Sequence, residues 1–309
     1  MKASLFLFLL MLWADLSHGQ LCRKWGEIKQ LGSLPVLKVR EASGLCLSTS
    51  QKERAYWVND SGNKTEIHVG NLNGENFQSV ALEGFKAADT EALVCARCQD
   101  GPCLILADIG DNRRRRKIIK LAFIQEQESW PEQVQPFKSL ELTYPDGPHD
   151  AEAMFVAPNG DLVIITKEFQ WLPPKASAAK VYSIDKQTWQ AKGNGKARLK
   201  LLGELPLPLW AQDLGPMGQV VTDASYNEKR GILGLLTYTG LIEIKVDKLK
   251  DVRASASWQS EKDFSLVPLK PLAQQETLGY TADDTVIWST EYFPPQAPIF
   301  SMTCQERGS

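Results

Sequence analysis

The chain has 309 residues, with 35 Lys and Arg against 37 Asp and Glu, a formal charge of −2 and a pI of about 6.0. Nucleic-acid-binding proteins usually carry a strong basic excess, so this balance argues against that class. Apolar residues make up 43% and charged residues 23% of the chain, a composition that excludes extensive disorder and indicates a globular protein.

The first segment has the pattern of a secretory signal peptide. Lys2 precedes an apolar run over residues 5–13, and Ser17 and Gly19 are small residues at positions −3 and −1 of a cleavage site. The run is too short to anchor the chain in a bilayer, and no later segment approaches the roughly 20 apolar residues that a spanning helix needs. We therefore predict a signal peptide over residues 1–19 and one domain over 20–309, in a secreted, extracellular protein without a membrane span.

Six cysteines, an even number, follow this segment: Cys22, Cys46, Cys95, Cys98, Cys103 and Cys304. In an oxidising compartment such a set favours disulfides over zinc. A bridge between Cys22 and Cys304 would tie the two ends of the domain together. Cys98 and Cys103 flank a turn sequence that suits a hairpin bridge, which would leave Cys46 with Cys95. Other pairings remain open on the sequence alone.

Short apolar runs bounded by Gly, Asn, Asp or Pro recur along the chain, which is the pattern of strands and turns. They lie at 55–58, 103–107, 161–166, 231–237 and 285–289. Before each run, a segment begins with an acidic residue followed by small and apolar residues. These five starts, spaced by 50 to 71 residues, are Glu41, Glu91, Glu152, Asp223 and Glu276. A third strand follows in each unit and a fourth in four of them, the weakest lying near 254–258. Such self-similarity is typical of repeat architectures.

The five units predict an all-β protein with the fold of a five-bladed β-propeller. The fifth unit lacks a fourth strand, and residues 34–39 near the N-terminus can supply it, thereby closing the ring. The long interval from Glu152 to Asp223 leaves a six-bladed propeller as the alternative. Its segments Pro173-Pro174 and Pro206-Leu-Pro208 favour loops over a further blade.

In such a blade the start of the first strand and the end of the second lie on the same face, so the fold would gather many acids at one mouth of the central channel. The set comprises Glu41, Asp60, Asp89, Glu91, Asp108, Asp111, Asp150, Glu152, Glu168, Asp223, Glu276 and Glu291. The pairs Asp89-x-Glu91 and Asp150-x-Glu152 share a spacing that directs both side chains of a strand to one side.

Carboxylates at such close range cannot all remain ionised. Either some are protonated, or some pair with Arg40, Lys167 or the run 113–116, or a cation lies among them. Oxygen ligands with Asn59 and Asn112 nearby suit Ca²⁺, which takes 6–8 oxygens. The alternative is that these acids only form turns by bonding their own backbone.

Other motifs support weaker hypotheses. His149 and Asp150 beside Glu152 are candidates for catalysis as a general base with its orienting acid, although a surface histidine with only a structural role fits as well. The basic run 113–117 suits phosphate or a sulfated glycan, or equally a solvated loop that pairs with the acidic rim. Of two N-glycosylation sequons, the one at Asn63 is the better acceptor if Asn59 has a structural role.

Several motifs resemble a family of secreted, mostly bacterial β-propellers without an established activity. They run in order from about residue 40 to 291: Glu41-x-Ser-Gly, Asn59-Asp-Ser-Gly62, Asp89-x-Glu-Ala92, Asp108-Ile-Gly-Asp-Asn112, the segment 144–153, Thr166-Lys-Glu168 and Gln275-Glu276. More distantly the layout is similar to SdiA-regulated propellers, phytase-like esterase propellers and the calcium-dependent gluconolactonase and paraoxonase group. This resemblance implies a calcium-binding centre near Glu41, Glu91, Asn112, Glu152, Asp223 and Glu276. The chain departs from the pattern at Thr237-Tyr238, where the other blades place an acid.

We therefore expect a secreted, disulfide-stabilised propeller whose acidic mouth binds Ca²⁺ and serves as an extracellular ligand-binding module. The alternative is a Ca²⁺-dependent hydrolase of an ester, lactone or phosphoester, and a third hypothesis is a scaffold without a small ligand. The expected partner is an unidentified extracellular ligand and not a nucleic acid, and the chain is treated as a monomer.

Overall fold

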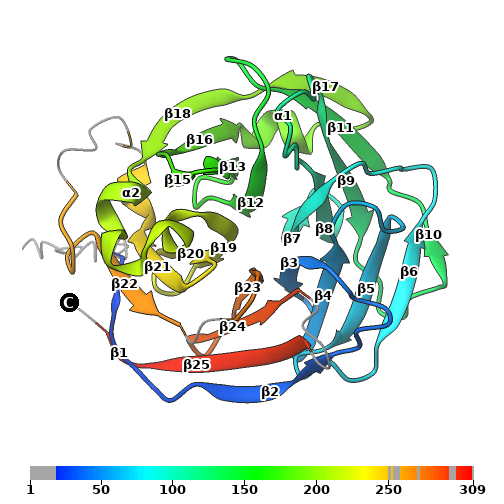
Figure 1. The fold of residues 1–309 in the computed structure, drawn as a ribbon. Helices are drawn as coiled ribbons and strands as arrows, with labels where there is room; N and C mark the ends of the chain where they lie inside the picture. The colour runs from blue at the N-terminus through cyan, green and yellow to red at the C-terminus, as the bar shows by residue number, and fades with distance from the viewer. Residues whose placement is uncertain (1–18, 250–251, 253–257, 270–271, 292–296, 308–309) are drawn as a thin grey trace, which may run out of the picture.

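The computed structural model describes residues 19–249, 252, 258–269, 272–291 and 297–307. Five sheets stand around a common axis (Figure 1), each with its first strand innermost and later strands further out. The predicted five-bladed β-propeller is therefore confirmed. Among the described residues, no helix is long and apolar enough to cross a lipid bilayer.

The blades are named 1 to 5 in chain order, and their strands are given from the axis outward. Blade 1 contains β3 (Ala42–Leu47), β4 (Arg54–Asn59), β5 (Glu66–Asn71) and β6 (Gln78–Leu82). Blade 2 contains β7 (Thr90–Cys98), β8 (Gly101–Asp108), β9 (Ile119–Gln125) and β11 (Lys138–Thr143). Blade 3 contains β12 (Ala151–Val156), β13 (Leu162–Thr166), β16 (Ala179–Ile184) and β18 (Lys200–Leu205). Blade 4 contains β19 (Val221–Asn227), β20 (Ile232–Thr237), β21 (Gly240–Lys245) and β22 (Phe264–Pro268). Blade 5 contains β23 (Gln275–Tyr280), β24 (Thr285–Thr290) and β25 (Ala297–Arg307).

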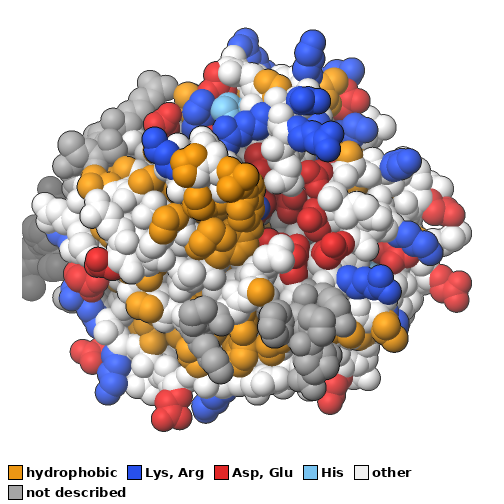
Figure 2. All heavy atoms as spheres, in the orientation of Figure 1, with side chains coloured by type: hydrophobic (Ala, Val, Ile, Leu, Met, Phe, Trp, Pro, Cys, Tyr) orange, Lys and Arg blue, Asp and Glu red, His pale blue; other side chains and the backbone are white. Residues whose placement is uncertain are grey.

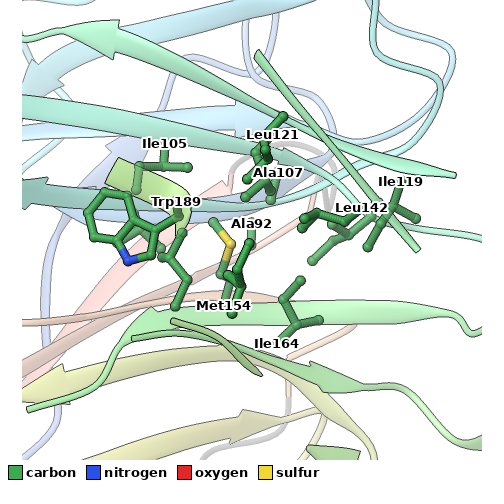
Figure 3. Packing of buried hydrophobic residues seen from close by; sticks show 14 of the residues in the cluster. Ala92, Ile105, Ala107, Ile119, Leu121, Leu142, Met154, Ile164 and Trp189 are labelled. Atoms are coloured by element: carbon green, nitrogen blue, oxygen red, sulfur yellow. The ribbon is translucent and has the colours of Figure 1, made fainter. Parts of the chain in front are cut away.

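The second strands read as continuous apolar runs because each blade is covered on both faces by its neighbours. In β4, Ala55, Tyr56, Trp57 and Val58 are all fully buried. A cluster of buried hydrophobic side chains fills the space between blades 2 and 3 (Figure 3). In it, Trp189 from the short helix α1 (Lys186–Gln190) packs with residues of both sheets. The hydrophobic core thus consists of wedges between blades, which hold the blades at fixed angles around the axis.

The ring closes in blade 5, but with a different segment from the predicted one. The closing strands are β1 (Cys22–Trp25) and β2 (Lys29–Leu34), which pair antiparallel with the C-terminal and N-terminal parts of β25. The prediction of a strand over 34–39 is wrong because Pro35 ends the ladder. Its carbonyl accepts the N–H groups of Lys38 and Val39 in a tight turn, and proline itself has no N–H to donate.

The interval that left room for a sixth blade instead holds small additions to the ring. They are the hairpin β14 (Phe169–Trp171) and β15 (Pro174–Ala176), α1, β17 (Gly195–Arg198), α2 (Leu207–Trp210) and the 3₁₀ turns η1 (Gln212–Leu214) and η2 (Pro216–Gln219). The six-bladed alternative is therefore wrong. The fourth strand of blade 4 was expected near 254–258. It is instead β22, while residues 254–257 lie outside the described part of the chain.

Two short segments pair in parallel with the outer edge of the preceding blade, an arrangement that the sequence did not predict. After β9 the chain forms β10 (Gln133–Val134) against β6 of blade 1, and after α1 it forms β17 against β11 of blade 2. We call these two segments straps. They cover edge strands whose backbone groups would otherwise be unpaired.

The three disulfides join Cys22 to Cys304, Cys46 to Cys95 and Cys98 to Cys103, which confirms all three suggested pairings. The first spans 282 residues and links β1 to β25 at the ring closure. The second joins the inner strands of blades 1 and 2, and the third closes the hairpin between β7 and β8.

Candidate functional site

Every inner strand carries a one-residue β-bulge where it faces the last residue of the second strand. In blade 2, for example, Thr90 pairs with Asp108 and Ala92 with Ala107, which leaves Glu91 as the extra residue. The extra residues of blades 1 to 5 are Ser43, Glu91, Glu152, Thr222 and Glu276. A bulge re-aims a side chain, so the fold brings three glutamates to equivalent positions at one mouth of the channel.

This register corrects the sequence alignment of the repeats. Glu41 lies two residues before the bulge of blade 1, which makes it the equivalent of Asp89 and Asp150, while Asp223 lies one residue after the bulge of blade 4. The expected equivalence of the five acids is therefore wrong for Glu41 and Asp223. The sequence contains no mark of a bulge, so aligning the acids placed these two out of register.

A second set of side chains follows the last residue of each second strand. In blades 1 to 5 these residues are Asp60, Ile109, Lys167, Tyr238 and Glu291. Because they lie beside the bulges, acids from the two sets meet around the channel mouth. The mouth divides into one part whose acids form no salt bridge among the described residues, which we call the part without a base, and one part that contains Lys167.

The part without a base is formed by Asp60, Asp89 and Glu91. One carboxylate oxygen from each lies within 4.8 Å of the others. Burial, and then the neighbouring Asp60, raise the pKa of Asp89 to about 7. Burial together with Glu152 raises the pKa of Glu91 well above its ordinary value. These shifts indicate that negative charge in this part is insufficiently compensated by the protein itself.

Two further observations define a space among these acids. Asp89 Oδ1 is buried and has no hydrogen-bond partner in the described structure. A Cβ atom added at Gly110 would lie 2.6 Å from both Asp89 Oδ2 and Glu91 Oε1. Gly110 is therefore required to be a glycine, because any side chain would fill the cradle that the carboxylates line. Sequence reasoning missed Gly110, although it stands in the motif Asp108-Ile-Gly-Asp-Asn112.

The other part of the mouth has its own cation. The Lys167 ammonium is buried, pairs with Glu152 Oε1 and donates to the Tyr238 hydroxyl at 2.9 Å. Tyr238 in turn donates to Glu276 Oε1 at 3.1 Å. Burial opposes the charge of Lys167, but Glu152, Tyr238 and Glu276 raise its pKa. Burial also raises the pKa of Glu152 to about 8 despite this ammonium, and leaves Glu152 Oε2 without a partner among the described residues.

Most of the remaining acids are already satisfied. Asp108 pairs with Arg116 at 2.8 Å, and Glu168 pairs with Arg114 at 2.9 Å. Arg114 and Arg116 of the basic run thus pair with the acidic rim, which is one of the uses that the sequence predicted for this run. Asp150 accepts the Asp111 N–H at 2.8 Å.

Three residues of the predicted calcium set lie apart from this group or are occupied. Asp223 is buried and accepts the backbone N–H groups of Ala224 and Leu278, at 2.7 and 2.6 Å, so it ties the inner strand of blade 4 to that of blade 5. Glu41 is exposed and accepts from Asn63 Nδ2 at 2.6 Å. Asn112 is exposed in the turn that follows Asp111. Glu91, Glu152 and Glu276 are the members that the fold brings together.

The structure also separates the two N-glycosylation sequons. Asn59 is buried, donates to the Lys38 carbonyl at 2.9 Å and lies 3.1 Å from His68 Nε2, whereas Asn63 is exposed. Asn59 therefore has the structural role on which the choice of Asn63 depended.

His149 is held between two carboxylates. Its Nδ1 lies 3.1 Å from Glu168 Oε1 and its Nε2 lies 3.2 Å from Asp146 Oδ1. Burial raises the pKa of Asp146, but hydrogen bonds from Lys180 and Tyr182 outweigh this effect and lower the pKa to about 2. Asp146 therefore stays ionised. With both ring nitrogens engaged, His149 has no free nitrogen for a substrate proton, which favours a structural role. It is buried, however, so the expectation that it lies at the surface is wrong.

Figure 2 shows the surface over the mouth. Acidic side chains line a hollow, basic side chains lie on one side of it, and a continuous hydrophobic surface lies on another. The fold and this surface define a disulfide-bridged, five-bladed β-propeller with an acidic channel mouth.

No protein-family model matches the sequence, and no curated protein is significantly similar to it. Among solved structures, a protein assigned as an oxidoreductase (glucose dehydrogenase) from Thermus thermophilus is similar with a TM-score of 0.50 and 9% identity, over 90% of this chain and 100% of that one. A gluconolactonase from Xanthomonas campestris has a TM-score of 0.46 and 10% identity, over 94% of this chain and 92% of that one. A second protein assigned as a gluconolactonase has a TM-score of 0.46 and 11% identity, over 86% of this chain and 75% of that one. At these identities the likeness concerns the propeller fold.

Proposed function

We propose that the channel mouth binds one Ca²⁺ ion through Asp60, Asp89 and Glu91, and that the protein is an extracellular ligand-binding module. The observation that carries the proposal is the convergence of three carboxylate oxygens within 4.8 Å of one another, on acids that form no salt bridge among the described residues. The unpartnered Asp89 Oδ1 and the absence of a side chain at Gly110 fit this use.

The donor chemistry favours calcium over other metals. All three groups offer oxygen, which is the ligand that Ca²⁺ takes, whereas zinc prefers nitrogen and sulfur. Glu152 and Glu276 border the site and add negative charge to it, but both also interact with the Lys167 ammonium. Three disulfides are typical of proteins in oxidising compartments and support secretion. The signal peptide over 1–19, the glycan at Asn63 and the monomeric state belong to the same proposal.

Titration calorimetry of the metal-stripped protein with CaCl₂ tests the proposal. We expect one Ca²⁺ per chain and a melting temperature that falls when EDTA is added, because an ion bound only to the folded state stabilises it. Asp89→Asn should weaken Ca²⁺ binding at least tenfold. Asp100→Asn is the matched control, since Asp100 is exposed in the hairpin at the opposite end of blade 2. Absence of heat together with an EDTA-independent melting curve would refute the calcium site.

The second candidate function is a Ca²⁺-dependent hydrolase of an ester, lactone or phosphoester. The Lys167–Tyr238 pair favours it, because a buried ammonium and hydroxyl next to the ion could donate hydrogen bonds to the negative oxygen that develops during hydrolysis. A bound Ca²⁺ would supply polarisation of the scissile carbonyl or phosphoryl oxygen. Hydrolysis of p-nitrophenyl acetate that requires Ca²⁺ and is lost in Glu91→Gln would favour this function over simple binding.

A further inference from the structure

A hydrophobic surface borders the acidic hollow (Figure 2). The β14–β15 hairpin begins two residues after Lys167 and carries Phe169, Trp171 and Leu172, and η2 carries Met217; we call these four residues the apolar wall. Phe169 and Met217 pack against a buried cluster of Ala176, Val220 and Tyr238, and Trp171 stacks edge-on against Phe169 with ring centroids 4.9 Å apart.

Tyr238 connects the wall to the charged site. Its ring belongs to the cluster beneath the wall, while its hydroxyl contacts Lys167 and Glu276 inside the mouth. Tyr238 therefore joins the polar groups of the mouth to the apolar residues beneath the wall. The wall and the acids are two sides of one site (Figure 2).

Two large apolar side chains of the wall are exposed to solvent. Trp171 is 55% and Leu172 is 87% exposed, at the tip of a hairpin that is held by contacts between β15 and η2. Exposed apolar patches beside a polar hollow mark binding sites.

We infer that the site binds a small amphiphile, with an oxygen-bearing head group at the mouth and an aliphatic or aromatic group on the apolar wall. The choice of head group rests on the proposed function, because a carboxylate or ester oxygen complements a bound Ca²⁺. The contribution of the wall does not depend on the ion, since an acidic mouth without Ca²⁺ would instead favour a cationic head over an anionic one.

Two probes with the same ten-carbon chain separate these contributions. Binding of decanoate and of decyltrimethylammonium is measured by calorimetry below their micelle-forming concentrations, in Ca²⁺ and in EDTA. We expect decanoate to bind in Ca²⁺, and decyltrimethylammonium to bind better in EDTA than in Ca²⁺. Octanoate should bind about tenfold more weakly than decanoate, because each buried methylene strengthens binding several-fold.

The double variant Trp171→Ser/Leu172→Ser should weaken both probes at least tenfold while it retains Ca²⁺ binding. Phe137→Ser is the matched control. Phe137 is 48% exposed and contacts Phe123, but it precedes β11 at the end of blade 2 remote from the mouth. If decanoate does not bind in Ca²⁺ but decyltrimethylammonium binds in EDTA and the double variant weakens that binding, the apolar wall is supported and the calcium site is refuted. Equal affinities in the double variant and the control, or no binding of either probe, would overturn the inference.

Discussion

Single residues decide which acids of the mouth are available. Asp108, Asp150, Glu168 and Asp223 all have a cation or backbone N–H groups as partners. Asp89 has a buried oxygen without such a partner. The number of acids at the mouth is therefore a poor guide to its binding capacity, and the distribution of partners is a better one.

The raised pKa values predict how stability depends on pH. Asp89 and Glu152, with pKa values of about 7 and about 8, keep protons in the folded state that the unfolded chain has already released. Stability in EDTA should therefore fall as the pH rises from about 5 to about 9, because the folded state binds more protons in that range. Melting temperatures by scanning fluorimetry measure this trend.

Calcium should reverse most of this decrease, because the ion stabilises the ionised carboxylates that deprotonation creates. Glu91→Gln should flatten the dependence in EDTA by removing one buried charge. A pH dependence that is identical with and without Ca²⁺ would argue that these carboxyls do not surround the ion.

Lys167 is expected to limit the mouth to a single divalent ion. Its ammonium pairs with Glu152 and lies near Glu276, so it neutralises the acids that would otherwise form a second oxygen site. Lys167→Met should raise the stoichiometry from one to two Ca²⁺ per chain and should destabilise the protein in EDTA by about 3–5 kcal/mol, as is typical when one partner of a buried pair is removed. Calorimetry and urea denaturation measure the two effects.

The control for this variant is Lys180→Met, because Lys180 pairs with Asp146, which is not one of the acids near Lys167. A folded Lys167→Met protein that still binds a single ion would show that Lys167 does not occupy a cation position.

At the scale of elements, most strands of the propeller could be predicted from the sequence. The apolar runs and their turn residues gave every second strand, because a strand covered on both faces must be apolar throughout. The closing strand was misplaced, because Lys29–Leu34 reads as polar. It is an outermost strand whose three N-terminal residues are exposed, so the hydrophobic pattern is weak there.

The bulges and straps could not be predicted for a related reason. A bulge changes the pairing by one residue without requiring a particular side chain, so Glu41 and Asp223 were aligned with Glu91. The straps β10 and β17 are two and four residues long, shorter than any periodic pattern that a sequence can display. Tyr238 was recognised only as a departure, since its role depends on its neighbours in blades 3 and 5.

At the scale of the whole molecule, the Cys22–Cys304 bridge is the covalent closure of the ring. Chain-entropy arguments make a disulfide more stabilising as the loop it closes grows, so a separation of 282 residues should contribute about 5 kcal/mol. The Cys98–Cys103 bridge, with a separation of 5, should contribute only about 2 kcal/mol.

Urea denaturation of two double variants compares these bridges. Cys22→Ser/Cys304→Ser should lose about two and a half times the free energy of unfolding that Cys98→Ser/Cys103→Ser loses. Equal losses would indicate that the ring remains closed by β1 and β2 pairing alone, in the unfolded ensemble as well as in the native state.

The straps have a mechanical consequence for the ring. The outermost strand of blade 1 is β10, which the chain segment of blade 2 supplies. The outermost strand of blade 2 is β17, which the chain segment of blade 3 supplies. A sector that begins to open therefore pulls backbone hydrogen bonds away from its neighbour. Under a pulling force, blades 1 to 3 should therefore unfold together, and not one after another.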